Sequence, residues 1–151
     1  MPKAASYDLV LRQLNALLEG ETDPIARMAN MAAVLHESFG FWWTGFYRVA
    51  GEELILGPFQ GPVACMHIPF GRGVCGTAWK RNETVVVPDV EAFPGHIACS
   101  SASRSEIVVP VHGKDGAVVA VLDIDSDRLG TFDEVDKEWL EKIVSLLTPV
   151  H

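Results

Sequence analysis

Two apolar segments near the end of the chain, residues 106–111 and 117–124, predict the two strands of a β-hairpin. The stretch between them contains Gly113 and Gly116, and glycine is typical of a tight connection. A hairpin decides which side chains share a face of a sheet, because side chains alternate along each strand. This pair of strands therefore constrains both the fold and the chemistry of the chain.

The expected register brings carboxylates together. A four-residue loop from Gly113 to Gly116 places Glu106 opposite Asp123, and Asp125 lies two residues farther along the same face. A shift of one residue would separate them, and the alternative interpretation is a solvated, charged sheet face. If the patch is buried, repulsion should keep at least one acid protonated near neutral pH. Such an acid can donate a hydrogen bond to a substrate oxygen and supply a proton.

The remaining pattern predicts an α+β fold, in which an antiparallel sheet is covered by N- and C-terminal helices. We expect one domain over residues 1–151. Asp23 and Pro24 have the residue types of a helix N-cap and first turn, and Thr131 with Glu134 matches a capping box. The expected helices are 6–19, 24–39, a short one that ends near 81, and a last one after 131; the other expected strands are 43–49, 52–56, 64–68 and 85–87.

Composition narrows the class of protein. The chain has 151 residues, of which 48% are hydrophobic and 21% are charged, as in soluble globular domains. Its net charge of -8 argues against nucleic acid or an anionic membrane as a partner, because both require a basic surface. We find no apolar run long enough to span a bilayer and no signal-peptide core at the N-terminus, so we expect a cytoplasmic protein.

The three cysteines point to thiol chemistry. Cys99 lies among serines in the 17-residue connection 88–104, which favours a reacting thiol over a core position. Cys75 lies near the start of a short helix, where the helix dipole favours a thiolate. Cys65 lies in an expected strand and fits a small buried hydrophobe best. His96 could tune the Cys99 thiol or lie on the surface, and no Cys-x-x-Cys or His-x-x-x-His pattern offers a structural zinc site.

Several short motifs lie between the aromatic cluster 41–47 and the last helix. They are Gly57-Pro58-Phe59-Gln60-Gly61, Ala64-Cys65, Ile68-Pro69, Gly71-Arg72-Gly73-Val74-Cys75-Gly76-Thr77, Pro88-Asp89-Val90, Gly95-His96-Ile97-Ala98-Cys99, Ser103-Arg104-Ser105-Glu106-Ile107-Val108 and Gly116 through Val121-Leu122-Asp123-Ile124-Asp125-Ser126. Together they resemble the GAF-domain free methionine-(R)-sulfoxide reductases. The most specific are the spacing of the three cysteines and the Asp-Ile-Asp-Ser strand.

This resemblance implies a six-stranded antiparallel sheet, a homodimer and a function in oxidative stress. It implies reduction of free methionine sulfoxide with electrons from thioredoxin and without a metal or organic cofactor. By motif position, Cys99 matches the nucleophile, Cys65 the main resolving cysteine and Cys75 an auxiliary one. The substrate-binding residues implied by the resemblance are Glu106, Asp123, Asp125 and the aromatic Trp43.

Ser100 stands where the family often has Asp, which changes the charge next to Cys99. Two other classes of function fit part of the pattern. A GAF-type small-molecule sensor would bind a ligand without turnover, but it does not need three spaced cysteines. A thiol redox sensor would use the cysteines, but it leaves the acids unexplained.

Overall fold

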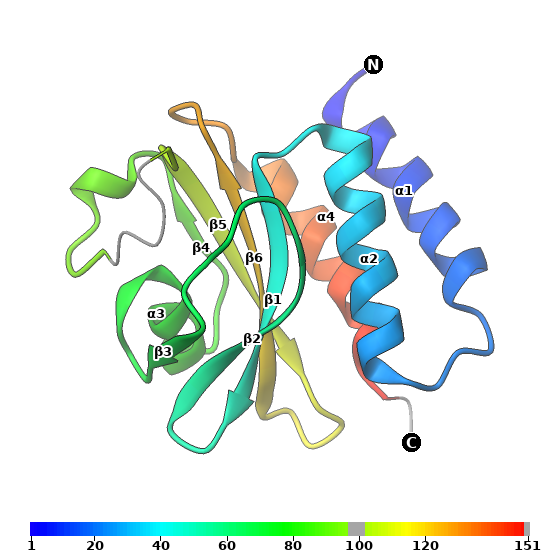
Figure 1. Cartoon of the computed structure of the whole chain (residues 1–151). Coiled ribbons are helices and arrows are strands. Elements are labelled where there is room, and N and C mark those ends of the chain that lie inside the picture. Colours follow the sequence, from blue (N-terminus) through cyan, green and yellow to red (C-terminus); the bar gives the residue numbers. More distant parts are fainter. Residues whose placement is uncertain (97–101, 150–151) are drawn as a thin grey trace.

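The computed structural model describes residues 1–96 and 102–149, which form an antiparallel six-stranded sheet flanked by helices (Figure 1). The α+β fold expected from the sequence is confirmed. The strand order is β3-β2-β1-β6-β5-β4. The elements are α1 (Lys3–Leu18), α2 (Pro24–Phe39), β1 (Trp43–Ala50), β2 (Glu53–Gln60), β3 (His67–Pro69), α3 (Gly73–Arg81), β4 (Val85–Val87), η1 (Val90–Ala92), β5 (Ser105–His112), β6 (Val118–Ser126), α4 (Glu134–Val144) and η2 (Ser145–Leu147).

The helices divide between the two faces of the sheet (Figure 1). On one face α2 packs on β1 and β2, α4 packs on β5, and α1 packs on both of these helices. On the other face α3 lies over β5 and β6. Within the described ranges, none of the helices is long and apolar enough to cross a bilayer.

Alternation along the central strands gives each face its own apolar layer. On the face covered by α2 and α4, Ile107, Val109 and Leu122 contribute to a core shared with α1, α2 and α4. On the other face, Val108 and Val121 belong to a smaller cluster with α3. The odd and even positions of β5 and β6 are thus committed to different layers, and this fixes the face on which the acids lie.

The start and end of α2 agree with the prediction. The Asp23 carboxylate accepts hydrogen bonds from the backbone N–H groups of Ile25 and Ala26, at 2.9 and 3.1 Å. Pro24 occupies the first turn, where a missing N–H costs nothing. The helix ends at Gly40, whose φ of 66° is the left-handed conformation that glycine adopts most easily.

The predicted hairpin register is wrong by two residues. His112 pairs with Val118, so the loop is one residue longer than expected, and a bulge between Val111 and His112 adds a second residue. Glu106 is therefore opposite Asp125 and not Asp123. Because the shift beyond the bulge is even, the side chains of residues 106–111 keep the face that was predicted for them.

Four other boundaries also differ from the prediction. The strand expected at 64–68 begins only at His67, so Cys65 lies in the preceding loop and is half-buried. The N-cap of α4 is Asp133 and not Thr131. Its carboxylate accepts from Val135 N–H while Asp136 accepts from Asp133 N–H, which completes a capping box. Helix α1 begins three residues early, at Lys3, and β2 extends beyond its predicted end to Gln60.

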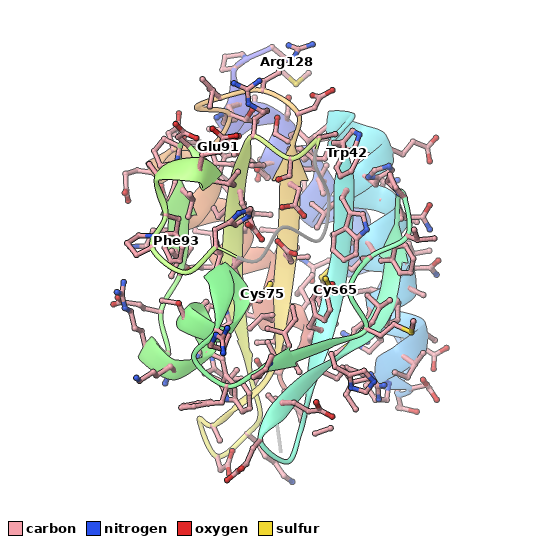
Figure 2. The ribbon with its side chains drawn as sticks, turned by 60° about the vertical axis from the view of Figure 1, so that its left-hand side comes forward. Trp42, Cys65, Cys75, Glu91, Phe93 and Arg128 are labelled. Carbon is pink, nitrogen blue, oxygen red and sulfur yellow. The ribbon has the colours of Figure 1, made fainter. Side chains whose placement is uncertain are left out.

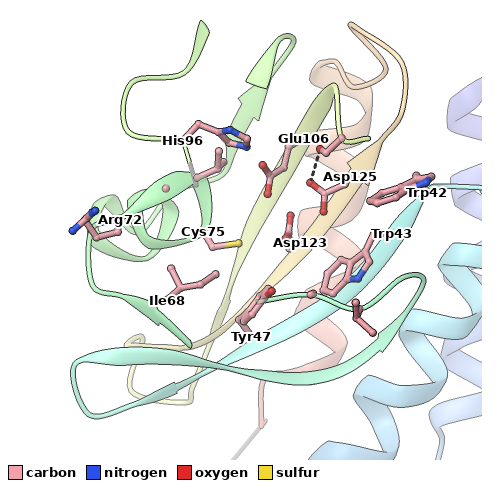
Figure 3. A pocket seen from close by; sticks show the side chains of 15 residues that line it. Trp42, Trp43, Tyr47, Ile68, Arg72, Cys75, His96, Glu106, Asp123 and Asp125 are labelled. Atoms are coloured by element: carbon pink, nitrogen blue, oxygen red, sulfur yellow. Dashed lines mark hydrogen bonds between the residues drawn. The ribbon is translucent and has the colours of Figure 1, made fainter. Parts of the chain in front are cut away.

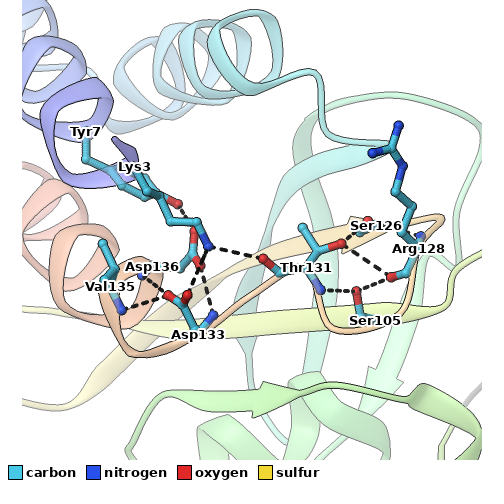
Figure 4. A network of polar contacts seen from close by, with 9 residues as sticks. All are labelled: Lys3, Tyr7, Ser105, Ser126, Arg128, Thr131, Asp133, Val135 and Asp136. Atoms are coloured by element: carbon cyan, nitrogen blue, oxygen red, sulfur yellow. Dashed lines mark hydrogen bonds and ion pairs between the residues drawn. The ribbon is translucent and has the colours of Figure 1, made fainter. Parts of the chain in front are cut away.

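The early start of α1 is explained by polar contacts with α4 (Figure 4). Lys3 Nζ donates to Asp136 Oδ2 at 2.6 Å, and the Tyr7 hydroxyl donates to Asp136 Oδ1 at 2.5 Å. Tyr7 and Asp136 are 0% and 2% exposed. Burial, together with the neighbouring Asp136 carboxylate, raises the pKa of Tyr7, so its hydroxyl remains a donor. The first helix is thus attached to the capping box of the last one.

Replacing Tyr7 by Phe should lower the free energy of unfolding by about 1 to 3 kcal/mol, because the buried Asp136 carboxylate loses a donor. Urea denaturation monitored by circular dichroism would measure the change. Asp8→Asn is the matched control, because it breaks only an exposed ion pair with Arg12 and should cost less than about 1 kcal/mol. Equal effects of both changes would contradict the anchoring role of Tyr7.

Candidate active site

Three carboxylates lie side by side on the sheet face that α3 covers (Figure 3). Glu106 projects from β5, and Asp123 and Asp125 project from β6. Glu106 and Asp123 are only 6% and 5% exposed. All three line one pocket. The predicted shared face is therefore confirmed, and the alternative of a solvated sheet face is excluded.

Burial changes the acidity of this cluster. It raises the pKa of Glu106 and of Asp125 well above the ordinary range, and the negative charge of Asp123 raises both further. Burial also raises the pKa of Asp123, but the contacts of Asp123 with Glu106 and Cys75 oppose that rise. All three acids therefore hold their protons to higher pH than exposed carboxyls do, and the rise is opposed most at Asp123.

The polar contacts of the acids are unequal. The Ser103 hydroxyl donates to Asp125 Oδ1 at 3.2 Å, which links the connection before β5 to the cluster. Asp123 Oδ1 is buried and has no hydrogen-bond partner within the described ranges. A buried acceptor without a donor is uncommon in folded proteins. It marks Asp123 as a group that can receive a ligand.

An aromatic wall stands beside the acids. Trp43 is 3% exposed, donates from Nε1 to the Pro62 carbonyl at 3.0 Å, and stacks on Phe59 with a centroid separation of 5.3 Å. The ring lies over Gly45, where an added Cβ would come within 2.7 Å of it. Since Trp43 pairs with Asp125 across the β1–β6 ladder, the ring borders the carboxylates.

Two further aromatic residues line the pocket and were not identified from the sequence. Tyr47 lies four residues beyond Trp43 in the same strand, so strand alternation could have placed it on this face. Its hydroxyl donates to the Cys65 carbonyl at 2.9 Å. Trp42 precedes β1, so the alternation of side chains along the strand does not predict which way it points.

Helix α3 supplies the opposite wall. Gly73, Val74 and Cys75 line the pocket at the N-terminus of this helix, where the first backbone N–H groups have no partner inside the helix. Cys75 is a free, buried cysteine. The expectation that the helix dipole makes it a thiolate is wrong, because burial and the neighbouring carboxylates raise the pKa of its thiol well above the ordinary value.

Of the two cysteines expected to form the disulfide, the structure describes Cys65 but not Cys99. Cys65 lies before β3, on the same sheet face as Cys75 (Figure 2), and the adjacent Ala64 lines the pocket. Cys99 lies outside the described residues, so its reactive role stays a prediction. His96 and Ser103, which flank Cys99 in the sequence, both line the pocket. His96 thus borders the acids, where the sequence left a surface position equally open.

The raised acid pKa values predict how stability depends on pH. Between the ordinary carboxyl pKa of about 4 and the raised values, the folded chain binds more protons than the unfolded chain. The cluster therefore lowers the free energy of unfolding as the pH rises through that window. Asp125→Asn should weaken this trend and make the protein more stable than the wild type at about pH 8.

Urea denaturation of both proteins at about pH 5 and about pH 8 would measure this difference. Asp127→Asn, a change at an exposed carboxylate just beyond β6, is the matched control. If Asp125→Asn and Asp127→Asn shift the pH dependence equally, the buried cluster is not its source.

Comparison with known proteins places this chain in a family. The GAF domain family matches residues 23–149. The chain is 56% identical to GAF domain-containing protein A of Dictyostelium discoideum, over 96% of this chain and 92% of that one. It is 46% identical to the free methionine-R-sulfoxide reductase of Escherichia coli, over 99% of this chain and 91% of that one.

A solved structure agrees with these likenesses. The free methionine-R-sulfoxide reductase of Neisseria meningitidis, solved in complex with its substrate, superposes with a TM-score of 0.95 at 55% identity, over 97% of this chain and 89% of that one. This chain thus shares its fold, over nearly its whole length, with that protein. The chain belongs to the GAF domain family, within the group that contains the free methionine-R-sulfoxide reductases.

Proposed function

We propose that this protein reduces free methionine-(R)-sulfoxide to methionine by cysteine chemistry and is recycled by thioredoxin. The observation that carries the proposal is the set of two buried acids, Glu106 and Asp123, and the half-buried Asp125 in one pocket beside the Trp43 ring. The names of the Escherichia coli relative and of the Neisseria meningitidis structure support the same reaction. No metal or organic cofactor takes part in the proposed reaction.

The pocket suits the groups of a free amino acid sulfoxide. A protonated Glu106 or Asp125 can donate a hydrogen bond to the sulfoxide oxygen, and the ionised Asp123 can hold the ammonium group. The N-terminal N–H groups of α3 can receive the carboxylate, since a helix N-terminus attracts anions. The Trp43 ring offers an apolar surface for the methyl group. A peptide-bound methionine lacks both end charges, so the site should select the free amino acid.

The first chemical step transfers oxygen. Hydrogen bonding to the sulfoxide oxygen makes the substrate sulfur more electrophilic, and Cys99 attacks it as a thiolate. The transient bond between the two sulfurs and the substrate S–O bond both break as the oxygen, with a proton from Glu106 or Asp125, becomes bonded to Cys99 as a sulfenic acid, and methionine leaves. The substrate sulfur gains the two electrons that the Cys99 sulfur loses.

The second step restores the enzyme in two exchanges. The Cys65 thiol condenses with the Cys99 sulfenic acid, which forms a disulfide and releases water. Thioredoxin, with a potential of about -270 mV, then reduces that disulfide and is itself oxidised. Cys75 is the weaker candidate for resolution, because burial beside Asp123 keeps it a neutral thiol and a thiolate is the better nucleophile.

We further propose that residues 1–151 act as one catalytic domain in a cytoplasmic homodimer. The resemblance to the reductase family supports the dimer, and sedimentation at several protein concentrations would test it. A monomer at all concentrations would remove the dimer from the proposal without affecting the chemistry.

The reaction is tested by thioredoxin-coupled NADPH oxidation with three substrates: free methionine-R-sulfoxide, the S epimer, and a methionine sulfoxide blocked at both ends. We expect oxidation of NADPH with the free R epimer only. Saturable binding of the free sulfoxide without NADPH oxidation would instead support a GAF-type sensor.

Variants of Cys99 and Cys65 should fail at different steps of the reaction. Cys99→Ser should abolish methionine release, because the nucleophile is lost. Cys65→Ser should release about one methionine per subunit and then stop, because the sulfenic acid is not resolved. Rapid-quench assays without thioredoxin would measure the burst. Substantial methionine release by Cys99→Ser, or full steady-state turnover by Cys65→Ser, would overturn these roles.

The acid variants should separate binding from catalysis. Glu106→Gln can still donate a hydrogen bond but cannot supply a proton, so kcat should fall by more than KM rises. Asp123→Asn loses the charge proposed to hold the ammonium group, so it should mainly raise KM. Steady-state kinetics between about pH 5 and about pH 9 would show the split. Wild-type constants in both variants would remove the acids from the mechanism.

A further inference from the structure

Three metal-binding side chains converge in the pocket from three separate elements (Figure 3). They are Cys75 from α3, Glu106 from β5 and Asp123 from β6. The Cys75 sulfur and one carboxylate oxygen of each acid all lie within 4.8 Å of one another. The three residues are far apart in the sequence, so no short metal-binding motif contains them.

Independent evidence for a ligand comes from Asp123. This side chain is 5% exposed, it lines the pocket, and its Oδ1 atom has no hydrogen-bond partner within the described ranges. Glu106 stands next to it, and both are separated from bulk water. A cation between them would give the unpartnered oxygen a ligand and would offset the repulsion between the two carboxylates.

We propose that Cys75, Glu106 and Asp123 bind one zinc ion when the pocket holds no substrate. Zinc accepts sulfur and carboxylate oxygen in the same tetrahedral site, whereas magnesium and calcium require oxygen ligands alone. Ligand atoms around zinc stand roughly 3.4 to 3.8 Å apart at the usual bond lengths. The present 4.8 Å limit therefore requires only side-chain adjustments of about 1 Å.

Binding replaces the thiol proton of Cys75 and the carboxyl proton of Glu106 by zinc, and both protons leave to solvent. A fourth position then remains open toward the pocket, where His96 or a water molecule can complete the tetrahedron. Because the ion occupies Glu106 and Asp123, it should compete with the free sulfoxide. Only this last consequence rests on the proposed function.

The direct test measures zinc binding on the full chain in a Cys65→Ser/Cys99→Ser background, which leaves Cys75 as its single thiol. Competition with a chromophoric chelator gives the stoichiometry and the Kd. We expect one zinc per chain in the background protein. Adding Cys75→Ser or Asp123→Asn should weaken binding by at least about tenfold, as expected for the loss of a ligand. Ser103→Ala is the matched control, because Ser103 lines the same pocket but is not one of the ligands.

Cobalt provides a second readout that does not depend on activity. Cobalt added to the background protein should give a thiolate-to-metal charge-transfer absorption that disappears in Cys75→Ser. Circular dichroism of each variant shows that it is folded. Failure to bind zinc in the folded background protein would overturn the proposal, as would unchanged affinity in Cys75→Ser.

The consequence for activity is tested separately on the wild-type protein. Zinc should inhibit methionine sulfoxide reduction competitively, and a chelator should reverse the inhibition. If the protein shows no turnover but binds zinc through Cys75, the proposed function fails and the metal site stands. If it turns over but the background protein binds no zinc, the metal site fails and the function stands.

Discussion

The crowding of three carboxylates, two of them buried, on one face of the β5–β6 pair is the constraint on which the rest of the structure depends. Like charges that are removed from water cannot all ionise easily, so burial and mutual repulsion raise the pKa of Glu106 and Asp125, and burial raises that of Asp123. This arrangement costs stability at neutral pH. The apolar layer on the opposite face, where Ile107, Leu122 and Ile124 are all 0% exposed, holds the two strands in place.

The same strands thus serve two purposes through their alternation. Alternate positions of these strands face different environments. One set packs in the apolar core shared with α1, α2 and α4, and the other set faces a pocket closed by α3 and Trp43. The pocket walls complement the acids: the N-terminus of α3 attracts negative charge, and the Trp43 ring offers apolar surface. These surfaces suit the substrate that we propose, a zwitterion with a polar sulfoxide and a small methyl group.

Sequence reasoning predicted much of the fold because the relevant signals are local. Asp23, Pro24 and Gly40 place the ends of α2 correctly, since capping depends on neighbours in the chain. The acids were assigned to one face although the register was wrong by two residues, because an even shift preserves side-chain direction. The N-cap of α4 was misplaced at Thr131 because Asp133 competes for the same role, and its contact with Lys3 from the other end of the chain favours it.

The sequence by itself determined the α+β class, the shared face of Glu106, Asp123 and Asp125, and the resemblance to a family of cysteine-dependent reductases. Only the tertiary structure decided the chemical state of these groups. The pKa of a side chain depends on burial and on charges brought near it by folding, so Cys75 is a neutral thiol beside Asp123 despite its place at a helix N-terminus. The roles of Tyr47 and Trp42 as pocket walls, and the approach of Cys75 to Glu106 and Asp123, also required the packing of α3 against the sheet, because no local pattern records distances between separate elements.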